Sequence, residues 1–168
     1  PAGAAAWVPA AAVPMAPGTD GAASTRSPAA VNGLVGLKPT RGRLPLDKLY
    51  RQMPVKIVAD GVVTRSVRDT AAFLREAERV YRALKLPPIG DVTRPGHTRL
   101  RIAVTTRGSR HHATPEVADL TAKTAALLEE LGHRVEPVDP PLPEWFEEDF
   151  LLYWALLAMV VVRTGRRE

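Results

Sequence analysis

The 168-residue sequence predicts an α/β fold, because strand and helix patterns alternate along it. The clearest unit spans residues 99–138, where two short predicted strands, residues 100–104 and 133–138, flank a helix. Strand, helix and strand at this spacing predict a right-handed βαβ unit with parallel strands. A second helix is predicted over residues 67–84, where apolar side chains recur every three or four positions.

Length and composition limit the class of protein. The length suits one domain with a hydrophobic core, and the absence of cysteine excludes disulfides, thiolate catalysis and cysteine-ligated zinc. We expect a cytoplasmic protein, because cysteine is absent and the first residues lack the basic segment of a signal peptide. The longest apolar run, residues 150–162, is shorter than the roughly twenty residues of a transmembrane helix, so no membrane span is predicted.

The N-terminal part of the sequence predicts short elements. Residues 4–8 suit a buried helix, but Pro9 removes an amide donor at a cost of about 3 kcal/mol in a helix interior. Residues 13–16 predict a short strand. Ser27 predicts the N-cap of a short helix whose first residue is Pro28, where the missing N–H costs nothing.

Residues 34–37 predict a buried strand, and a basic segment, residues 38–56, follows it. The formal net charge of +5 permits weak association with nucleic acid or anionic membranes. We expect no specific nucleic-acid site, because only Tyr50 interleaves the basic residues and no binding motif is present. A solvated or partner-covered loop is the expectation for this segment, whose basic residues are Lys38, Arg41, Arg43, Lys48, Arg51 and Lys56.

The C-terminal part predicts three helices with clear ends. Ser66 and Asp69 have the spacing of a capping box before the helix at residues 67–84, and a linker is predicted over residues 89–98. The helix of the βαβ unit opens at Thr114 and ends at Gly132, where a left-handed residue is favoured. A last helix is predicted over residues 144–163. The predicted buried face of the βαβ helix consists of Val117, Leu120, Thr124, Leu127, Leu128 and Leu131.

The stretch GTDGAASTRSPAA, residues 18–30, is the candidate for chemistry. Its small residues allow a ligand to approach the backbone N–H groups, and such groups aimed at one point form an oxyanion hole. Ser24 follows directly, where its hydroxyl and those N–H groups could face the same carbonyl carbon. The residues alone leave an ordinary Gly/Ala/Ser surface turn as an equal alternative.

This stretch resembles the amidase signature, a segment of a large family of serine amide hydrolases. The family pattern is approximately G-[ST]-D-x-G-G-S-[IT]-R-x-P-A, followed by a G-L-V-G-L-K-P-T-x-G-R block that residues 33–43 match nearly throughout. Residues 61–74, GVVTRSVRDTAAFL, resemble a third family segment. The residues that match the first pattern are Gly18, Thr19, Asp20, Ser24, Arg26, Pro28 and Ala29.

The resemblance implies a partial amidase domain over residues 1–168, with part of a three-layer α/β/α fold and a mixed central sheet. The signature segment with the nucleophile loop would occupy residues 1–74, the βαβ unit residues 99–138 and the final helix residues 144–163. Ser24 would be the nucleophile, and the backbone of Gly21, Ala22 and Ala23 would form the oxyanion hole. The resemblance implies no cofactor or metal, a small-molecule amide substrate and a possible homodimer.

Two departures from the family pattern bear on activity. Ala22 and Ala23 stand where the family has two glycines, and alanine in a left-handed conformation costs roughly 1–2 kcal/mol per residue. The family's base is a lysine that acts through a bridging serine, which would fall just before Pro1. None of the five lysines, Lys38, Lys48, Lys56, Lys85 and Lys123, matches that base. We therefore expect an internal or C-terminal fragment of an amidase.

Several interpretations stay open at this stage. The first is an amidase that forms an acyl-enzyme on Ser24, and the second is a catalytically silent chain of the same family that serves as a binding or assembly piece. A basic interaction module is the third. A Ser-His-Asp triad or a metal site at His111 and His112 has no supporting pattern of spacing. Asp20 and Arg26 are expected to hold the loop in place rather than to react. The resemblance implies a structural role for Lys38.

Overall fold

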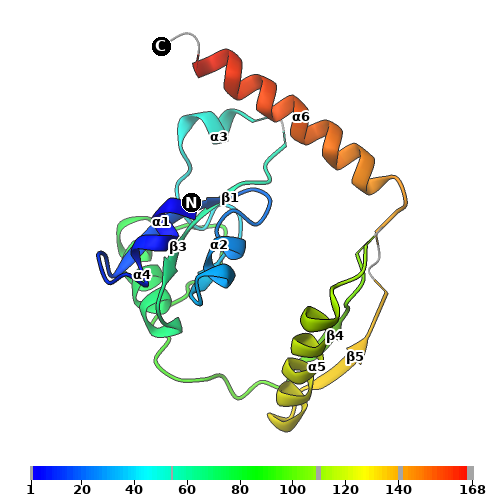
Figure 1. The fold of residues 1–168 in the computed structure, drawn as a ribbon. Helices are drawn as coiled ribbons and strands as arrows, with labels where there is room; N and C mark the ends of the chain where they lie inside the picture. Colours follow the sequence, from blue (N-terminus) through cyan, green and yellow to red (C-terminus); the bar gives the residue numbers. More distant parts are fainter. Residues whose placement is uncertain (1, 54, 109–110, 140–141, 166–168) are drawn as a thin grey trace. The chain divides into compact units, whose positions relative to one another are not determined.

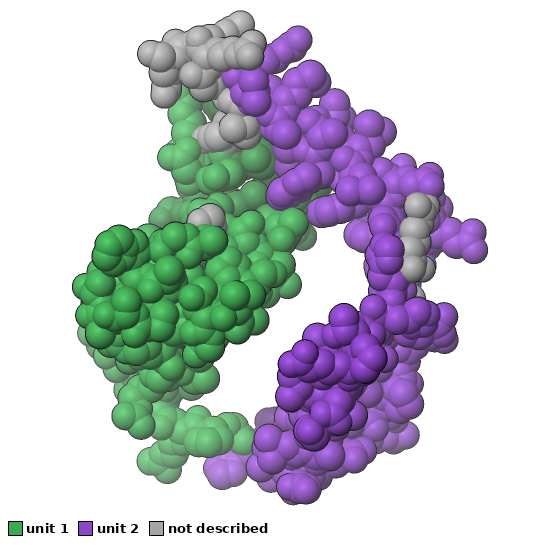
Figure 2. All heavy atoms as spheres, in the orientation of Figure 1, with its two compact units in different colours: residues 1–96 green, residues 97–168 purple. Residues whose placement is uncertain are grey.

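The computed structural model describes residues 2–53, 55–108, 111–139 and 142–165. The chain forms two compact units, residues 1–96 and residues 97–168 (Figure 2). The boundary between the units falls inside the predicted linker, residues 89–98, which contains neither helix nor strand. Helices and strands alternate in both units, as the predicted α/β class requires.

Unit 1, residues 1–96, is built on a three-stranded antiparallel sheet with the order β1-β3-β2 (Figure 1). The strands are β1, Met15–Asp20, β2, Val35–Leu37, and the central β3, Ala59–Thr64. β1 extends four residues beyond the strand predicted at residues 13–16 and thereby carries Asp20 at its end. β3 was not predicted, because Asp60 and Gly61 are residue types that strands disfavour.

Helices cover both faces of this sheet, which gives unit 1 three layers. Val63 of β3 packs against Ala5 of α1, Ala2–Trp7, and Ala29 of α2, Arg26–Val31. Successive side chains of a strand point to opposite faces. The hydroxyl of Thr64 accordingly lies 2.7 Å from that of Thr70 in α4, Val67–Val80, on the other face.

The first three helices of unit 1 differ from the prediction. α1 ends at Trp7, two residues before Pro9, so the proline bounds the helix instead of preventing it. α2 begins at Arg26, and its N-cap is Thr25 instead of Ser27. The expected loop at residues 38–56 contains a short helix, α3, Lys48–Gln52.

α4 confirms its predicted start but ends earlier than predicted. Its N-cap Ser66 accepts the N–H of Asp69 at 3.1 Å. The helix ends at Val80, and the chain segment after it is bound to a side chain of its last turn. The Glu78 carboxylate accepts the N–H groups of Ile89 and Gly90, and Arg43 binds both Glu78 and the carbonyl of Pro87.

Glycines at two strand positions let α2 approach the sheet. A Cβ on Gly18 would lie 2.5 Å from Oγ1 of Thr25. A Cβ on Gly36 would lie 2.6 Å from Cβ of Ala29 and 2.9 Å from the carbonyl oxygen of Thr25. The start of α2 and its N-cap therefore lie directly against β1 and β2, and larger residues at these two positions would separate the helix from the sheet.

Unit 2, residues 97–168, contains a parallel pair of strands, as predicted. The strands are β4, Arg101–Val104, and β5, Arg134–Pro137, and Ile102 pairs with Val135. α5, Pro115–Glu130, connects them and is capped by Thr114, and Gly132 after it has the predicted left-handed φ of +87°. This pair forms a sheet of its own, separate from the antiparallel sheet of unit 1.

The predicted burial of α5 is wrong for the described part of unit 2. No residue of α5 is buried, and Val117, Leu120, Leu127 and Leu131 are each more than half exposed. The physical reason is area, since two four-residue strands are too small to cover one face of a sixteen-residue helix. α6, Phe146–Gly165, begins with acidic residues and has Arg163 in its last turn. In the described ranges, no helix combines the length with the hydropathy that a membrane crossing requires.

Gly36→Ala tests the close packing of α2 on the sheet. We expect the substitution to lower the free energy of unfolding by about 1–3 kcal/mol, because the new methyl group meets backbone and a Cβ instead of a flexible side-chain end. Gly96→Ala is the matched control, since its Cβ would meet nothing within 4 Å. Equal unfolding free energies for the two variants in urea titration would contradict this account of the packing.

Candidate active site

Ser24 lies in the turn that connects β1 to α2. The turn leaves the sheet after Asp20 and enters the helix at Arg26. Ser24 is half-buried, and its hydroxyl makes no hydrogen bond within the described part of the chain. The hydroxyl is therefore free to meet a ligand that approaches this turn.

The carboxylate of Asp20 organises the turn from inside. Its side chain is 1% exposed. Its two oxygens accept the backbone N–H groups of Ala23 at 2.7 Å and Thr25 at 3.2 Å. Arg26 adds a two-point contact, with Nε at 3.0 Å and Nη2 at 3.2 Å from the carboxylate, and its N–H lies at 3.4 Å. The predicted holding role of Asp20 and Arg26 agrees with these contacts.

These contacts keep Asp20 ionised. Burial alone would raise the pKa of the Asp20 carboxyl, but the hydrogen bonds from the Arg26 side chain and from the N–H of Thr25 outweigh it. The result is a pKa lowered from 3.8 to about 2. At neutral pH the turn therefore closes around a full negative charge.

Lys38 holds the turn from a second direction. It follows β2 in the sequence, and its Nζ donates to the carbonyl oxygen of Gly21 at 3.2 Å and to that of Ile57 at 2.8 Å. The same Nζ lies 3.8 Å from Oδ1 of Asp20. The turn is thus tied both to its own strand and to the residues just before β3. The family resemblance implied a structural role for Lys38 but gave no signal for these particular partners.

The backbone N–H groups of the turn are not equivalent. That of Ala23 is occupied by Asp20, whereas those of Gly21, Ala22 and Ser24 make no hydrogen bond among the described residues. Ala23 has φ of +67°, in the left-handed region, and Ala22 does not. Of the two alanines, only Ala23 therefore has the left-handed conformation in which an alanine is strained.

The remaining candidate groups lie away from this turn in the sequence. All four histidines, His97, His111, His112 and His133, belong to unit 2, so unit 1 by itself cannot form a Ser-His-Asp triad. His133 accepts the N–H of Leu100 through Nδ1 at 3.1 Å. The described residues contain no cluster of three potential metal ligands.

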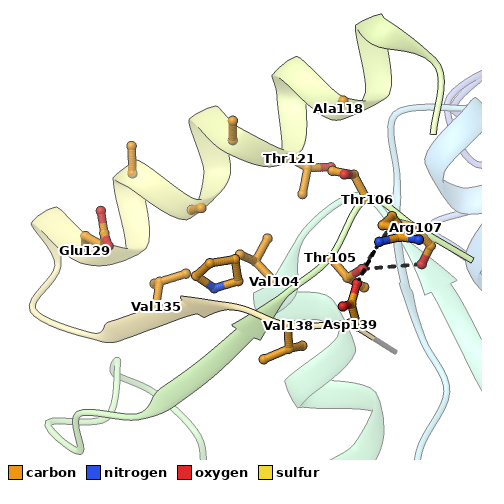
Figure 3. A pocket seen from close by; sticks show the side chains of 14 residues that line it. Val104, Thr105, Thr106, Arg107, Ala118, Thr121, Glu129, Val135, Val138 and Asp139 are labelled. Atoms are coloured by element: carbon orange, nitrogen blue, oxygen red, sulfur yellow. Dashed lines mark hydrogen bonds and ion pairs between the residues drawn. The ribbon is translucent and has the colours of Figure 1, made fainter. Parts of the chain in front are cut away.

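Unit 2 contains a cavity of about 580 Å³ between α5 and the strands β4 and β5 (Figure 3). Its walls are largely apolar, with Val104, Val135 and Val138 among them. At one end Arg107 and Asp139 form an exposed ion pair at 3.1 Å. The lining hydroxyls of Thr105 and Thr121 bind backbone groups rather than a base, so the turn around Ser24 remains the candidate active site.

The pH dependence of stability tests the role of Asp20. Because the native pKa is depressed, the carboxylate stabilises the fold above pH 4, and this contribution disappears as the pH falls toward 2. Asp20→Asn should lower the free energy of unfolding by about 2 kcal/mol at pH 7, and the difference from the parent chain should vanish near pH 2. Asp91→Asn, at an exposed ion pair with Arg75, is the control and should change the free energy of unfolding by less than about 0.5 kcal/mol.

Glycine substitutions test the strain at Ala23. Ala23→Gly should raise the free energy of unfolding by up to about 1 kcal/mol, because relief of the left-handed strain exceeds the added entropy of the unfolded chain. Ala22→Gly should lower it by roughly 0.5–1 kcal/mol, because no strain is relieved at that position. Effects of the same sign in chemical denaturation would contradict the difference between the two alanines.

Comparison with known proteins identifies relatives along nearly the whole chain. A family model described as Amidase matches residues 2–165. Putative amidase AmiC of Mycobacterium leprae (strain TN) is 63% identical over 165 residues, which are 98% of this chain and 35% of the relative. Putative amidase AmiA2 of Mycobacterium tuberculosis (strain ATCC 25618 / H37Rv) is 37% identical over 149 residues, 82% of this chain and 30% of the relative.

The solved structures that resemble this chain indicate the same family. A bacterial aryl acylamidase of the amidase signature enzymes family matches with a TM-score of 0.82 and 30% identity, over 98% of this chain and 35% of that chain. The 6-aminohexanoate cyclic dimer hydrolase matches with a TM-score of 0.63 and 34% identity, over 83% of this chain and 31% of that chain. The α/β fold class is thereby confirmed, and the chain spans about a third of the length of the curated relatives it matches. By the match of residues 2–165 and the shared fold, this chain belongs to the amidase family.

Proposed function

We propose that this chain carries the nucleophile of an amide hydrolase and that Ser24 attacks the carbonyl carbon of the amide. The observation that carries the proposal is the turn after β1, where a free, half-buried hydroxyl follows backbone N–H groups that have no partner among the described residues. Family membership supports an amide as the substrate. The proposed substrates are small-molecule carboxylic amides with non-peptide C–N bonds.

The reaction has two stages. In the first, Ser24 Oγ bonds to the carbonyl carbon and loses its proton to a base, and the carbonyl oxygen becomes an oxyanion. Collapse of this intermediate breaks the C–N bond, and the amine leaves with a proton. In the second, water attacks the acyl-enzyme by the same route and releases the carboxylic acid and the free Ser24 hydroxyl.

The oxyanion would be bound by the N–H groups of Gly21, Ala22 and Ser24. We assign Ala23 a different role from the one first expected, because its N–H is held by Asp20 at 2.7 Å. Ala23 would fix the shape of the turn and leave the preceding and following N–H groups for the substrate. The base would be the lysine and bridging serine that the family resemblance implies, and no residue of this chain matches them.

A catalytically silent chain of the same family is the second candidate. The observation that favours it is that, in the described part of the chain, no base contacts the Ser24 hydroxyl. A positioned base typically contributes a factor of about 10²–10⁴ to the rate. The two candidates predict opposite results when a lysine and a bridging serine are supplied.

Covalent labelling by a fluorophosphonate separates the two candidates. We expect Ser24 labelling and amide hydrolysis in a version of the protein extended upstream by the corresponding segment of putative amidase AmiC, and about 10²-fold less or none in this chain alone. Ser24→Ala should abolish both signals in the extended protein. Ser27→Ala, at an exposed serine three residues further on, should retain them.

Two other outcomes would contradict the proposed role of Ser24. An extended protein that is folded but neither labels nor hydrolyses amides would favour the silent chain. Hydrolysis that survives Ser24→Ala would remove Ser24 from the mechanism altogether.

A further inference from the structure

We propose that Lys38 is a positioning residue for the reaction at Ser24. Lys38 holds the peptide group between Gly21 and Ala22, so that the Ala22 N–H points toward the oxyanion and is polarised for binding it. The inference rests on the proposed function of Ser24. The inference does not depend on the identity of the base that activates Ser24, because it concerns only contacts inside unit 1.

The ammonium group of Lys38 lies between three acceptors. Its Nζ is 3.2 Å from the carbonyl oxygen of Gly21, 2.8 Å from that of Ile57 and 3.8 Å from Oδ1 of Asp20. A lysine ammonium group has three N–H donors, so two of them can bind the two carbonyls while the third N–H points toward the Asp20 carboxylate. The Lys38 side chain is 21% exposed, and this partial burial keeps water from replacing the contacts freely.

The contact with Gly21 determines the direction of the Ala22 N–H. The carbonyl of Gly21 and the N–H of Ala22 belong to one planar peptide group, and the described chain contains no cis peptide bond. In a trans peptide these two bonds point in opposite directions. Because Lys38 holds the carbonyl on its own side, the Ala22 N–H points away from Lys38, and this N–H has no partner in the described structure.

The same contact strengthens the Ala22 N–H as a donor. A cation bound to a peptide carbonyl draws electron density toward the oxygen, and linked hydrogen bonds polarise one another. The resulting gain in N–H acidity is largest when negative charge develops on the acceptor, as it does in a tetrahedral intermediate. Lys38 would therefore stabilise the transition state more than the bound substrate.

Lys38 and Asp20 act on neighbouring peptide groups with opposite charges. Asp20 accepts the Ala23 N–H and removes it from the oxyanion, whereas Lys38 binds the Gly21 carbonyl and leaves the Ala22 N–H free. The bond from Lys38 to Ile57 adds an anchor beside β3, the central strand of the sheet. Lys56 is the matched control, because its Nζ also donates to backbone carbonyls, those of Arg51 and Met53, but does not touch the turn.

Steady-state kinetics of the extended protein test the inference. Lys38→Met should lower kcat by about 10²-fold or more, the usual loss for one oxyanion donor, and change KM by less than about threefold. Lys38→Arg should restore kcat to within about tenfold of the parent protein, because a guanidinium also donates to carbonyls. Lys56→Met should leave kcat within about twofold.

A tetrahedral analogue distinguishes positioning from a general structural role. A trifluoromethyl ketone forms an oxyanion adduct with a reactive serine, so Lys38→Met should weaken its inhibition by about the same factor as kcat. Inhibition by a ground-state carboxamide should change by less than about threefold. A rise in KM without a fall in kcat, or equal losses in Lys38→Met and Lys56→Met, would overturn the inference.

Two further comparisons cover the cases in which Lys38→Met does not fold or Ser24 is not the nucleophile. If Lys38→Met does not fold, Lys38→Gln takes its place. Because this variant loses the charge but keeps an uncharged donor, we expect a smaller fall in kcat, of roughly tenfold. A folded Lys38→Gln with kcat within threefold of the parent protein contradicts the inference. Ser24→Ala is measured in parallel: if it retains hydrolysis, the proposed function fails, and if it is inactive while Lys38→Met is not, only the role of Lys38 fails.

Discussion

The buried carboxylate of Asp20 is the interaction on which the turn around Ser24 depends. A carboxylate that is 1% exposed must find donors within the protein, and Asp20 finds them in the residues that follow it. The backbone N–H groups of Ala23 and Thr25 and the side chain of Arg26 converge on it. The chain consequently folds back at the end of β1, and this reversal presents Ser24 between strand and helix.

The sheet and α2 make this geometry possible through small residues. Asp20 lies on the same face of β1 as Gly18, two residues earlier, and that face receives α2. Gly18 leaves room for Thr25 and Gly36 leaves room for Ala29, so the first turn of the helix lies close enough for its N–H groups to reach the carboxylate. Small residues around the nucleophile thus serve two purposes, access for a ligand and close packing behind it.

Local signals predicted much of the structure, and contacts between distant residues account for the rest. The caps at Ser66 and Thr114 and the left-handed Gly132 depend on neighbours within four residues, and all three were predicted correctly. The central strand β3 was missed because its place between two other strands, rather than its composition, makes it a strand. Lys38 binds Gly21 and Ile57, which are 17 and 19 residues away in the sequence, so the resemblance could imply a structural role for Lys38 but not its partners.

The contacts also explain how an alanine persists at position 23. A left-handed alanine costs roughly 1–2 kcal/mol, whereas a hydrogen bond from its N–H to a charged carboxylate contributes about 1.5–3 kcal/mol. The bond from Ala23 to Asp20, at 2.7 Å, is therefore strong enough to offset the strain. Because Asp20 and Lys38 hold adjacent peptide groups by opposite charges, the turn is oriented before any substrate arrives. Donors that need no reorganisation during the reaction stabilise developing charge most effectively, so the stability of this turn and the proposed chemistry at Ser24 have one common origin.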